Sequence, residues 1–145
     1  MEPRGANIML SIGEIDCRVN DGIQKHIRNH PKKSQSELIQ STVEHYLNYV
    51  HQITISKSLH VTIQGIPCPN IDTNNVEQSD LLQLINLIRE FNKVLQDETK
   101  KRNFDFLDLH TLTDRGDGFS NGLWHIDEHH LSPAGMIEAW RRHFE

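Results

Sequence analysis

The sequence lacks the features that mark several large classes of protein. It has only two cysteines, Cys17 and Cys68, which form no C-x-x-C pair, so a disulfide framework is not expected. No apolar run approaches the ~20 residues that a helix needs to cross a bilayer. The first residues, 1–6, contain no apolar segment typical of a signal peptide. We therefore expect no membrane association and a reducing, cytoplasmic location.

An excess of basic residues is also absent. The chain carries 15 Lys and Arg against 20 Asp and Glu, which gives a net charge of −5. Because binding to nucleic acid requires a basic surface, we expect no nucleic-acid partner. With 24% charged and 36% hydrophobic residues in a chain of 145, the composition is that of one globular domain, residues 1–145.

The apolar pattern predicts strands that alternate with helices. Three short apolar or β-branched runs predict strands at residues 7–12, 59–66 and 104–109. Apolar residues at three- and four-residue steps predict helices that begin near Ser34 and Ser79. Ser34 and Glu37 match the S-x-x-E capping box. Residues 14–33 show no such pattern, which predicts a long loop with at most a helical turn.

The last helix is predicted from Ser132 and Pro133, with an apolar face formed by Met136, Ile137, Trp140 and Phe144. Strands that alternate with helices are typically parallel and joined by right-handed crossovers. We therefore expect an α/β fold with a short parallel sheet of about three strands and helices on both faces.

Polar stretches follow the predicted strands. In open α/β sheets, ligands bind at the carboxyl ends of the strands. Residues 13–18, 65–70 and 127–130 are therefore expected along one rim. In the last stretch, Asp127 and His130 are three residues apart and can meet across one turn of chain. Such a carboxylate can orient an imidazole that acts as a base, although a short D-x-x-H motif also serves to cap and solubilise a helix.

At these residues the sequence resembles a known family. The segment Asp127–Gly135 (DEHHLSPAG) resembles the D-x-x-H-L-s-x-x-G segment that closes SGNH/GDSL hydrolases. The run Ile8–Asp16 (IMLSIGEID) resembles that family's apolar strand and G-x-N-D block, in a variant form that reads G-E-I-D-C-R. The resemblance covers nearly the whole chain and corresponds to the C-terminal portion of the family's three-layer, flavodoxin-like fold.

The resemblance implies hydrolysis of an ester, with His130 as general base and Asp127 as its orienting carboxylate. It places Gly13 and Asp16 at the Gly and Asp of the third family block. The oxyanion-hole Asn of that block falls on Ile15, which has no side-chain donor. The implied substrate is a small or carbohydrate-linked ester, and no cofactor or metal is implied.

The G-E-I-D-C-R variant implies further pocket residues. Glu14, Asp16 and Arg18 are expected to shape the substrate pocket, and we hypothesise that Arg18 stabilises negative charge there. Cys17, beside Arg18, is either a thiol with a lowered pKa or a small packing residue, and we favour packing.

The serine nucleophile of the family has no counterpart here. Its G-D-S block and the Gly that is its second oxyanion donor precede the strand at residues 7–12, and the six residues before this strand include no serine. We therefore expect a chain that is incomplete at its N-terminus relative to the family and inactive alone. Ser11 is expected to pack in the core. Ser120 is expected in a flexible loop, with nothing in the sequence that would activate it.

Two other functions stay open. The chain could be a non-catalytic fragment or degenerate relative that acts as an interaction module, with a homodimer formed through the unpaired edge of the strand at residues 7–12. Less favoured is a metal-binding protein, because imidazole and carboxylate ligands cluster without an H-E-x-x-H motif. The candidate ligands are His110, His125, Asp127, His129 and His130.

Overall fold

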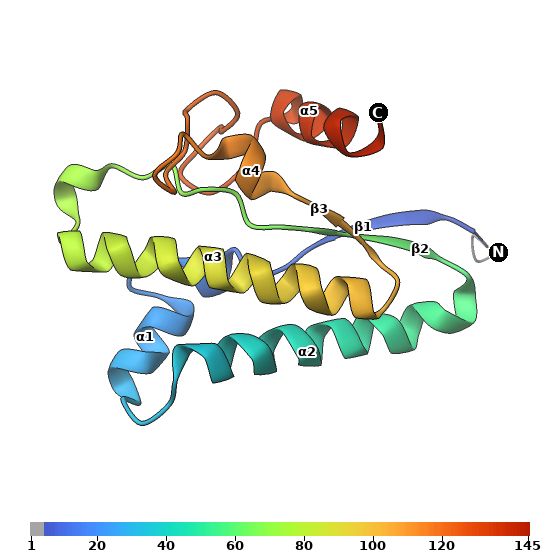
Figure 1. Ribbon diagram of the computed structural model, residues 1–145, viewed down its shortest axis with the longest axis horizontal. Helices are drawn as coiled ribbons and strands as arrows, with labels where there is room; N and C mark the ends of the chain where they lie inside the picture. The colour runs from blue at the N-terminus through green and yellow to red at the C-terminus, as the bar shows by residue number, and fades with distance from the viewer. Residues whose placement is uncertain (1–4) are drawn as a thin grey trace.

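Three parallel strands form the centre of the computed structural model, which describes residues 5–145 (Figure 1). The strands are β1 (Asn7–Ser11), β2 (His60–Gln64) and β3 (Asp105–Leu107), and they pair in the order β1-β2-β3. The register runs from Asn7 opposite His60 to Ser11 opposite Gln64, so all carboxyl ends meet at one edge. Residues 1–4, in which we expected no signal peptide, lie outside the described part.

Helices cover both faces of this sheet (Figure 1). The long helices α2 (Gln35–Thr54) and α3 (Gln78–Lys101) pack together on one face, and α5 (Pro133–Phe144) lies on the other. Short helices follow the strand ends: α1 (Gly22–Asn29) and α4 (Leu109–Thr113), with single 3-10 turns at 15–17, 55–57 and 73–75. The α/β fold expected from the sequence, with a three-stranded parallel sheet between helical layers, is confirmed.

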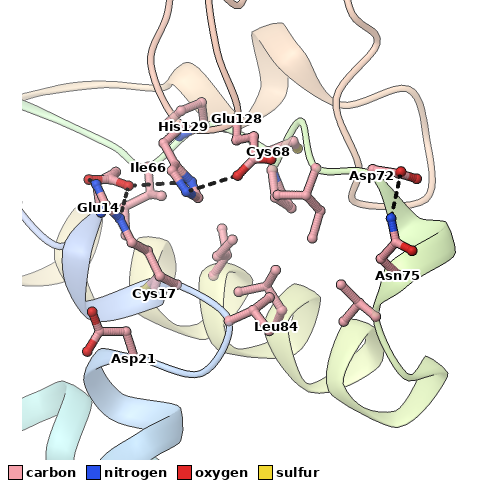
Figure 2. Close-up of a pocket in the computed structure, with 17 residues that line it drawn as sticks. Glu14, Cys17, Asp21, Ile66, Cys68, Asp72, Asn75, Leu84, Glu128 and His129 are labelled. Atoms are coloured by element: carbon pink, nitrogen blue, oxygen red, sulfur yellow. Dashed lines mark hydrogen bonds and ion pairs between the residues drawn. The ribbon is translucent and has the colours of Figure 1, made fainter.

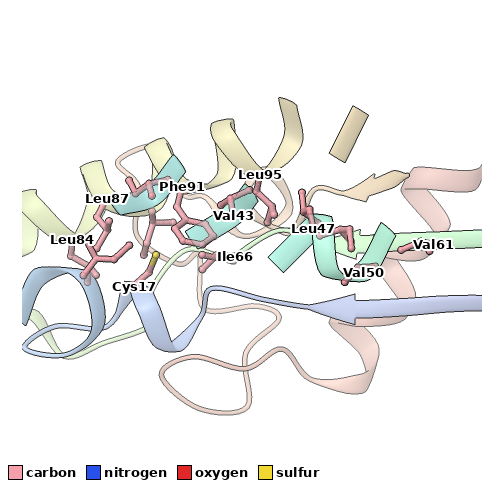
Figure 3. Close-up of a cluster of buried hydrophobic side chains, with 14 residues drawn as sticks. Cys17, Val43, Leu47, Val50, Val61, Ile66, Leu84, Leu87, Phe91 and Leu95 are labelled. Atoms are coloured by element: carbon pink, nitrogen blue, oxygen red, sulfur yellow. The ribbon is translucent and has the colours of Figure 1, made fainter. Parts of the chain in front are cut away.

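The main core lies between the sheet and the α2–α3 layer (Figure 3). Its side chains come from the apolar stripes that the sequence showed on α2 and α3, and from the buried strand β2. Phe91, Leu47, Leu95 and Ile63 are fully buried there. Burying each such side chain contributes about 1.5–3 kcal/mol, so this layer provides most of the hydrophobic stabilisation.

Helix ends explain where the predicted boundaries hold and where they do not. The capping box of Ser34 and Glu37 is present at the start of α2. Ser79, by contrast, does not cap α3, which begins one residue earlier with Glu77 at its N-cap. The third strand is shorter than expected, because the side chain of Asp108 accepts a hydrogen bond from the Thr111 backbone and starts α4.

Residues 14–33 hold more structure than a loop with a helical turn. Asp21 accepts a hydrogen bond from the Gly22 backbone at the start of α1, which runs for eight residues. Its apolar residues are only Ile23, which is buried, and Ile27, which packs against the core. Two apolar residues in a polar segment are too few to give a readable period, which is why the sequence pattern missed this helix.

The predicted apolar face of α5 is less buried than the sequence pattern suggested. Ile137, Trp140 and Phe144 are 69%, 41% and 48% exposed, whereas the residues of α5 that are buried are Gly135 and Ala139. The helix therefore packs through its small residues and Met136, which is partly buried, and leaves Ile137, Trp140 and Phe144 largely in solvent. Among residues 5–145, no helix combines the length and the apolar character needed to span a membrane.

Candidate functional site

The carboxyl edge of the sheet carries two adjoining cavities. The larger, about 350 Å³, is lined among others by Glu14, Arg18, Cys68 and His129 (Figure 2). The second, about 290 Å³, lies beside His130 and shares Glu14 and His129 with the first. The three stretches expected along one rim, at 13–18, 65–70 and 127–130, thus come together there.

Asp127 and His130 form a hydrogen-bonded pair on this rim. Asp127 Oδ2 lies 2.8 Å from His130 Nδ1. Asp127 Oδ1 accepts hydrogen bonds from the backbone N–H groups of His129 and His130, at 2.8 and 2.7 Å. The backbone bond from His129, followed by the bonds from His130, holds the pKa of the Asp127 carboxyl well below its usual range. Because the carboxylate only accepts, the proton of the neutral ring sits on Nδ1 and leaves Nε2 as an acceptor.

The loop that carries this pair is held from two sides. The backbone N–H of Asn70, in the loop after β2, donates to the carbonyl of Glu128 at 3.0 Å, and its side chain donates to the carbonyl of Asp127 at 3.2 Å. On the other side, Ser132 caps α5 through the Gly135 backbone N–H. The loop is therefore fixed between the carboxyl end of β2 and the start of α5, although both side chains of the pair are half exposed.

A second Asp–His pair has a contact of similar length in a different place, through the other ring nitrogen. His60 Nε2 lies 2.7 Å from Asp105 Oδ2, and the His60 side chain is 58% exposed, as is that of His130. This pair sits at the amino ends of β2 and β3, away from both cavities. An Asp–His contact alone does not single out a site, so the location of Asp127 and His130 beside a cavity is what distinguishes them.

Glu14 and Arg18 are bound to each other on the wall of the larger cavity (Figure 2). The Arg18 guanidinium donates two hydrogen bonds to the Glu14 carboxylate, both at 2.7 Å. Burial favours the neutral acid, but the hydrogen bonds and charge of Arg18 outweigh it and lower the pKa of Glu14. His129 Nδ1 lies 3.5 Å from Glu14 Oε1. The Arg18 charge is thus already paired within the cavity wall.

The other two residues expected in the pocket lie outside the lining of both cavities. Gly13 adopts a φ of +90°, and a Cβ at this position would overlap the Phe91 ring, so glycine lets the chain turn tightly above the core. Asp16 lies in the 3-10 turn at 15–17, where burial raises the pKa of its carboxyl. The structure brings together Glu14, Arg18 and the Asp127–His130 loop, but not these two.

The serines differ from expectation. Ser11 is exposed rather than part of the core, and it lines the second cavity together with His130. Ser120 is 7% exposed rather than in a flexible loop: its Oγ lies 2.9 Å from His125 Nδ1 and accepts a hydrogen bond from the Gly122 backbone. Ser120 lines neither of the two cavities, so its contact with His125 braces the loop and does not face a substrate.

Cys17 is buried as a packing residue. It is 4% exposed, and burial raises the pKa of its thiol well above the usual value. This direction is opposite to the one that activation by Arg18 would produce, which favours the packing role. Of the candidate metal ligands named from the sequence, those at 125–130 form no metal-binding arrangement within residues 5–145. One candidate, His110, does lie in a group of three ligand types, together with Cys68 and Asp114. The spacing of 42 residues between Cys68 and His110 gave no sequence signal for this group.

Comparisons with known proteins support the fold. Neither a protein-family model nor a curated protein matches the sequence. Several solved structures match in three dimensions, among them two enzymes from Streptomyces. An extracellular lipase from Streptomyces rimosus has a TM-score of 0.61 and 14% identity, over 95% of this chain and 69% of the lipase. Phospholipase A1 from Streptomyces albidoflavus has a TM-score of 0.59 and 16% identity, over 99% of this chain and 72% of that enzyme. At this identity, the likeness shows a shared fold alone.

Proposed function

We propose that this chain carries the base end of an ester-hydrolysing site of the SGNH/GDSL type. The observation that carries the proposal is the 2.8 Å contact between Asp127 and His130 beside a cavity at the carboxyl edge of a parallel sheet. This edge is where α/β folds bind their ligands. Support also comes from the fold shared with a lipase and a phospholipase A1.

In the proposed mechanism, His130 Nε2 accepts the proton of the nucleophile as it attacks the ester carbonyl, and Asp127 stabilises the imidazolium that results. Within residues 5–145, no serine forms a hydrogen bond to His130, whose Nδ1 is engaged by Asp127. Ser11 lines the same cavity as His130 but makes no such bond. As the family resemblance implies, we propose that this chain lacks the serine nucleophile and is inactive as a two-step enzyme. The activity proposed for the chain alone is slow hydrolysis by a water molecule that His130 activates.

The wall of the larger cavity is mostly apolar, with Glu14, Arg18 and His129 among its few polar groups. Such a mixture suits a small or carbohydrate-linked ester, whose apolar part packs on the wall while the polar groups orient it. A cytoplasmic location is part of the proposal and rests on two cysteines that are both free. Fractionation of cells followed by detection of the protein tests the location.

The test of the proposed activity is hydrolysis of p-nitrophenyl acetate by the purified chain and by the variant His130→Ala. The matched control is His60→Ala, because His60 has an equally exposed ring and an equally close carboxylate but lies far from the cavities. We expect His130→Ala to remove most of the protein-dependent rate and His60→Ala to leave it unchanged. Equal rates in all three proteins would reject a catalytic role for His130.

The second candidate is an interaction module, and one observation favours it. β1 pairs with β2 on one side and forms the edge of the sheet on the other. Beside it, Met9, Ile137 and Trp140 line an apolar groove, and all three are more than 40% exposed. Unpaired strand edges and exposed apolar patches are sites of association, so we propose that two copies pair through this edge.

Analytical ultracentrifugation separates this candidate from a monomer. A homodimer that dissociates on Met9→Lys, but not on the control Leu123→Lys, supports pairing through the β1 edge. Leu123 is 72% exposed and lies outside the groove, so it controls for the loss of an apolar side chain. A monomer at all concentrations would reject the dimer.

A further inference from the structure

Three residues from two segments bring metal-ligand atoms together behind the candidate site. Cys68 lies in the loop after β2, while His110 is in α4 and Asp114 is at its C-cap, four residues later. The Cys68 sulfur, a ring nitrogen of His110 and a carboxylate oxygen of Asp114 all lie within 4.8 Å of one another. We propose that these residues bind one Zn²⁺ ion.

The donor atoms are available for a ligand. Cys68 is fully buried, and its sulfur makes one long contact, 3.6 Å to the carbonyl of His110. His110 Nε2 is buried without a hydrogen-bond partner. A buried ring nitrogen without a partner is destabilising, and binding a metal would give it one. Asp114 uses Oδ1 to accept hydrogen bonds from the backbone of Gly116 and Gly118. These two bonds orient the carboxylate, as second-layer contacts do in metal sites.

The spacing suits zinc after a small closure. With bonds of about 2.3 Å to sulfur and 2.0–2.1 Å to nitrogen or oxygen, tetrahedral ligands lie roughly 3.3–3.6 Å apart. Side-chain rotations of about an ångström bring donor atoms from 4.8 Å to this separation. Three protein ligands leave a fourth position for a water molecule, as in zinc sites of open geometry.

The ligand types select the metal. A cysteine thiolate disfavours Mg²⁺ and Ca²⁺, which prefer oxygen ligands, and favours Zn²⁺. On binding, the Cys68 thiol loses its proton to solvent, so that one thiolate and one carboxylate balance the two charges of the ion. Arg89 carries a positive charge close enough to act on both His110 and Asp114. Because the ion with its thiolate and carboxylate has no net charge, Arg89 would not repel the occupied site.

The frame around the three ligands is already fixed. Thr113 Oγ1 accepts a hydrogen bond from the Cys68 backbone at 2.9 Å and donates to the carbonyl of Leu109 at 2.8 Å. The next residue, Pro69, accepts a hydrogen bond from the Ser120 backbone. A bound ion would thus tie the loop after β2 to α4 at the wall of the larger cavity, which Cys68 lines. It would hold these two segments together with one coordination position open to water, and this inference does not depend on ester hydrolysis.

The experiment is a Co²⁺ titration of the full chain after removal of metal by a chelator, followed by competition with Zn²⁺. We expect one Co²⁺ per chain, a thiolate-to-cobalt charge-transfer band, and displacement of the spectrum by one equivalent of Zn²⁺. Cys68→Ser should abolish the charge-transfer band, and His110→Ala should weaken binding at least tenfold. Cys17→Ser, at the other buried cysteine, should leave the spectrum unchanged.

Several results would overturn the proposal. Binding of Co²⁺ without a charge-transfer band excludes Cys68 as a ligand, and this outcome is read from the unaltered protein even if Cys68→Ser fails to fold. Loss of binding in His130→Ala with full binding in His110→Ala would move the ion to the exposed histidines. Absence of binding to the unaltered chain at micromolar Co²⁺ and Zn²⁺ would reject the site.

Discussion

Replacing Asn92 by alanine should destabilise the fold and the wall of both cavities. Asn92 lies on α3, is 9% exposed, and uses both ends of its amide on the backbone N–H and C=O of one residue, Ile66, just after β2. Its Oδ1 accepts from the Ile66 backbone N–H at 2.7 Å, and its Nδ2 donates to the Ile66 carbonyl at 2.8 Å. Ile66 lines both cavities, so this amide joins the helical layer to the candidate site.

The magnitude follows from what the substitution leaves behind. Two hydrogen bonds contribute about 1 kcal/mol each, and a buried donor or acceptor without a partner costs about 1–3 kcal/mol. Entry of one water molecule can satisfy part of this loss. We therefore expect Asn92→Ala to lower the free energy of unfolding by about 2–4 kcal/mol. With a urea m-value of about 2 kcal/mol/M, in the middle of the usual range, the midpoint should fall by roughly 1–2 M.

Urea unfolding followed by circular dichroism measures this effect against a matched control. Asn86 is on the same helix and exposed, so Asn86→Ala makes the same change in helix propensity without the buried amide contacts. The difference between the two variants isolates the bonds to Ile66. If Asn92→Ala unfolds within about 0.5 kcal/mol of Asn86→Ala at equal m-values, the amide bridge does not stabilise the fold as we argue.

Two further predictions concern single positions. Hydrogen bonds from Arg102, and next from Lys101, lower the pKa of Glu98 from 4.5 to about 2. The ionised Glu98 therefore adds to the free energy of unfolding in full above the pKa of the unfolded chain, and this stabilisation is lost as the pH falls toward 2. Glu98→Gln should therefore flatten the loss of melting temperature between neutral pH and about pH 2, and an unchanged pH dependence would contradict the assignment. Gly13→Ala should lower the melting temperature by several degrees, because it combines a φ of +90° with overlap on the Phe91 ring. A melting temperature equal to that of the unaltered protein would show that this turn is not constrained.

The layers of the fold could be predicted because, in the long elements, the spacing of apolar residues and the capping residues indicate the same structure. The stripe on α2 and its capping box point to the same helix, and the β-branched run at β2 is buried as its composition indicates. The short elements escaped for the opposite reason. In α1, two apolar residues carry too little periodicity, and in α4 a side-chain cap at Asp108 ended the third strand early.

The candidate site could be predicted where its residues are close in the sequence. Asp127 and His130 meet because three residues span one turn, and the sheet topology places them near Glu14 and Arg18. Contacts between distant residues gave no signal. The bond between the Asn92 amide and Ile66 spans 26 residues, and the exposure of the apolar face of α5 depends on how Gly135 and Ala139 pack. Contacts between distant residues and the exposure of a helix face depend on tertiary packing, which the local sequence pattern does not reveal.

The central claim is that His130 acts as a base on this rim, and the part of ester hydrolysis that depends on His130 tests it most directly. The quantity to measure is the rate of p-nitrophenyl acetate hydrolysis by the unaltered chain minus that of His130→Ala, across the pH range over which the fold is stable. We expect this difference to make up most of the protein-dependent rate, because without the imidazole no base takes the proton of the attacking group. A difference of zero at every pH, or an equal difference for His60→Ala, would contradict it.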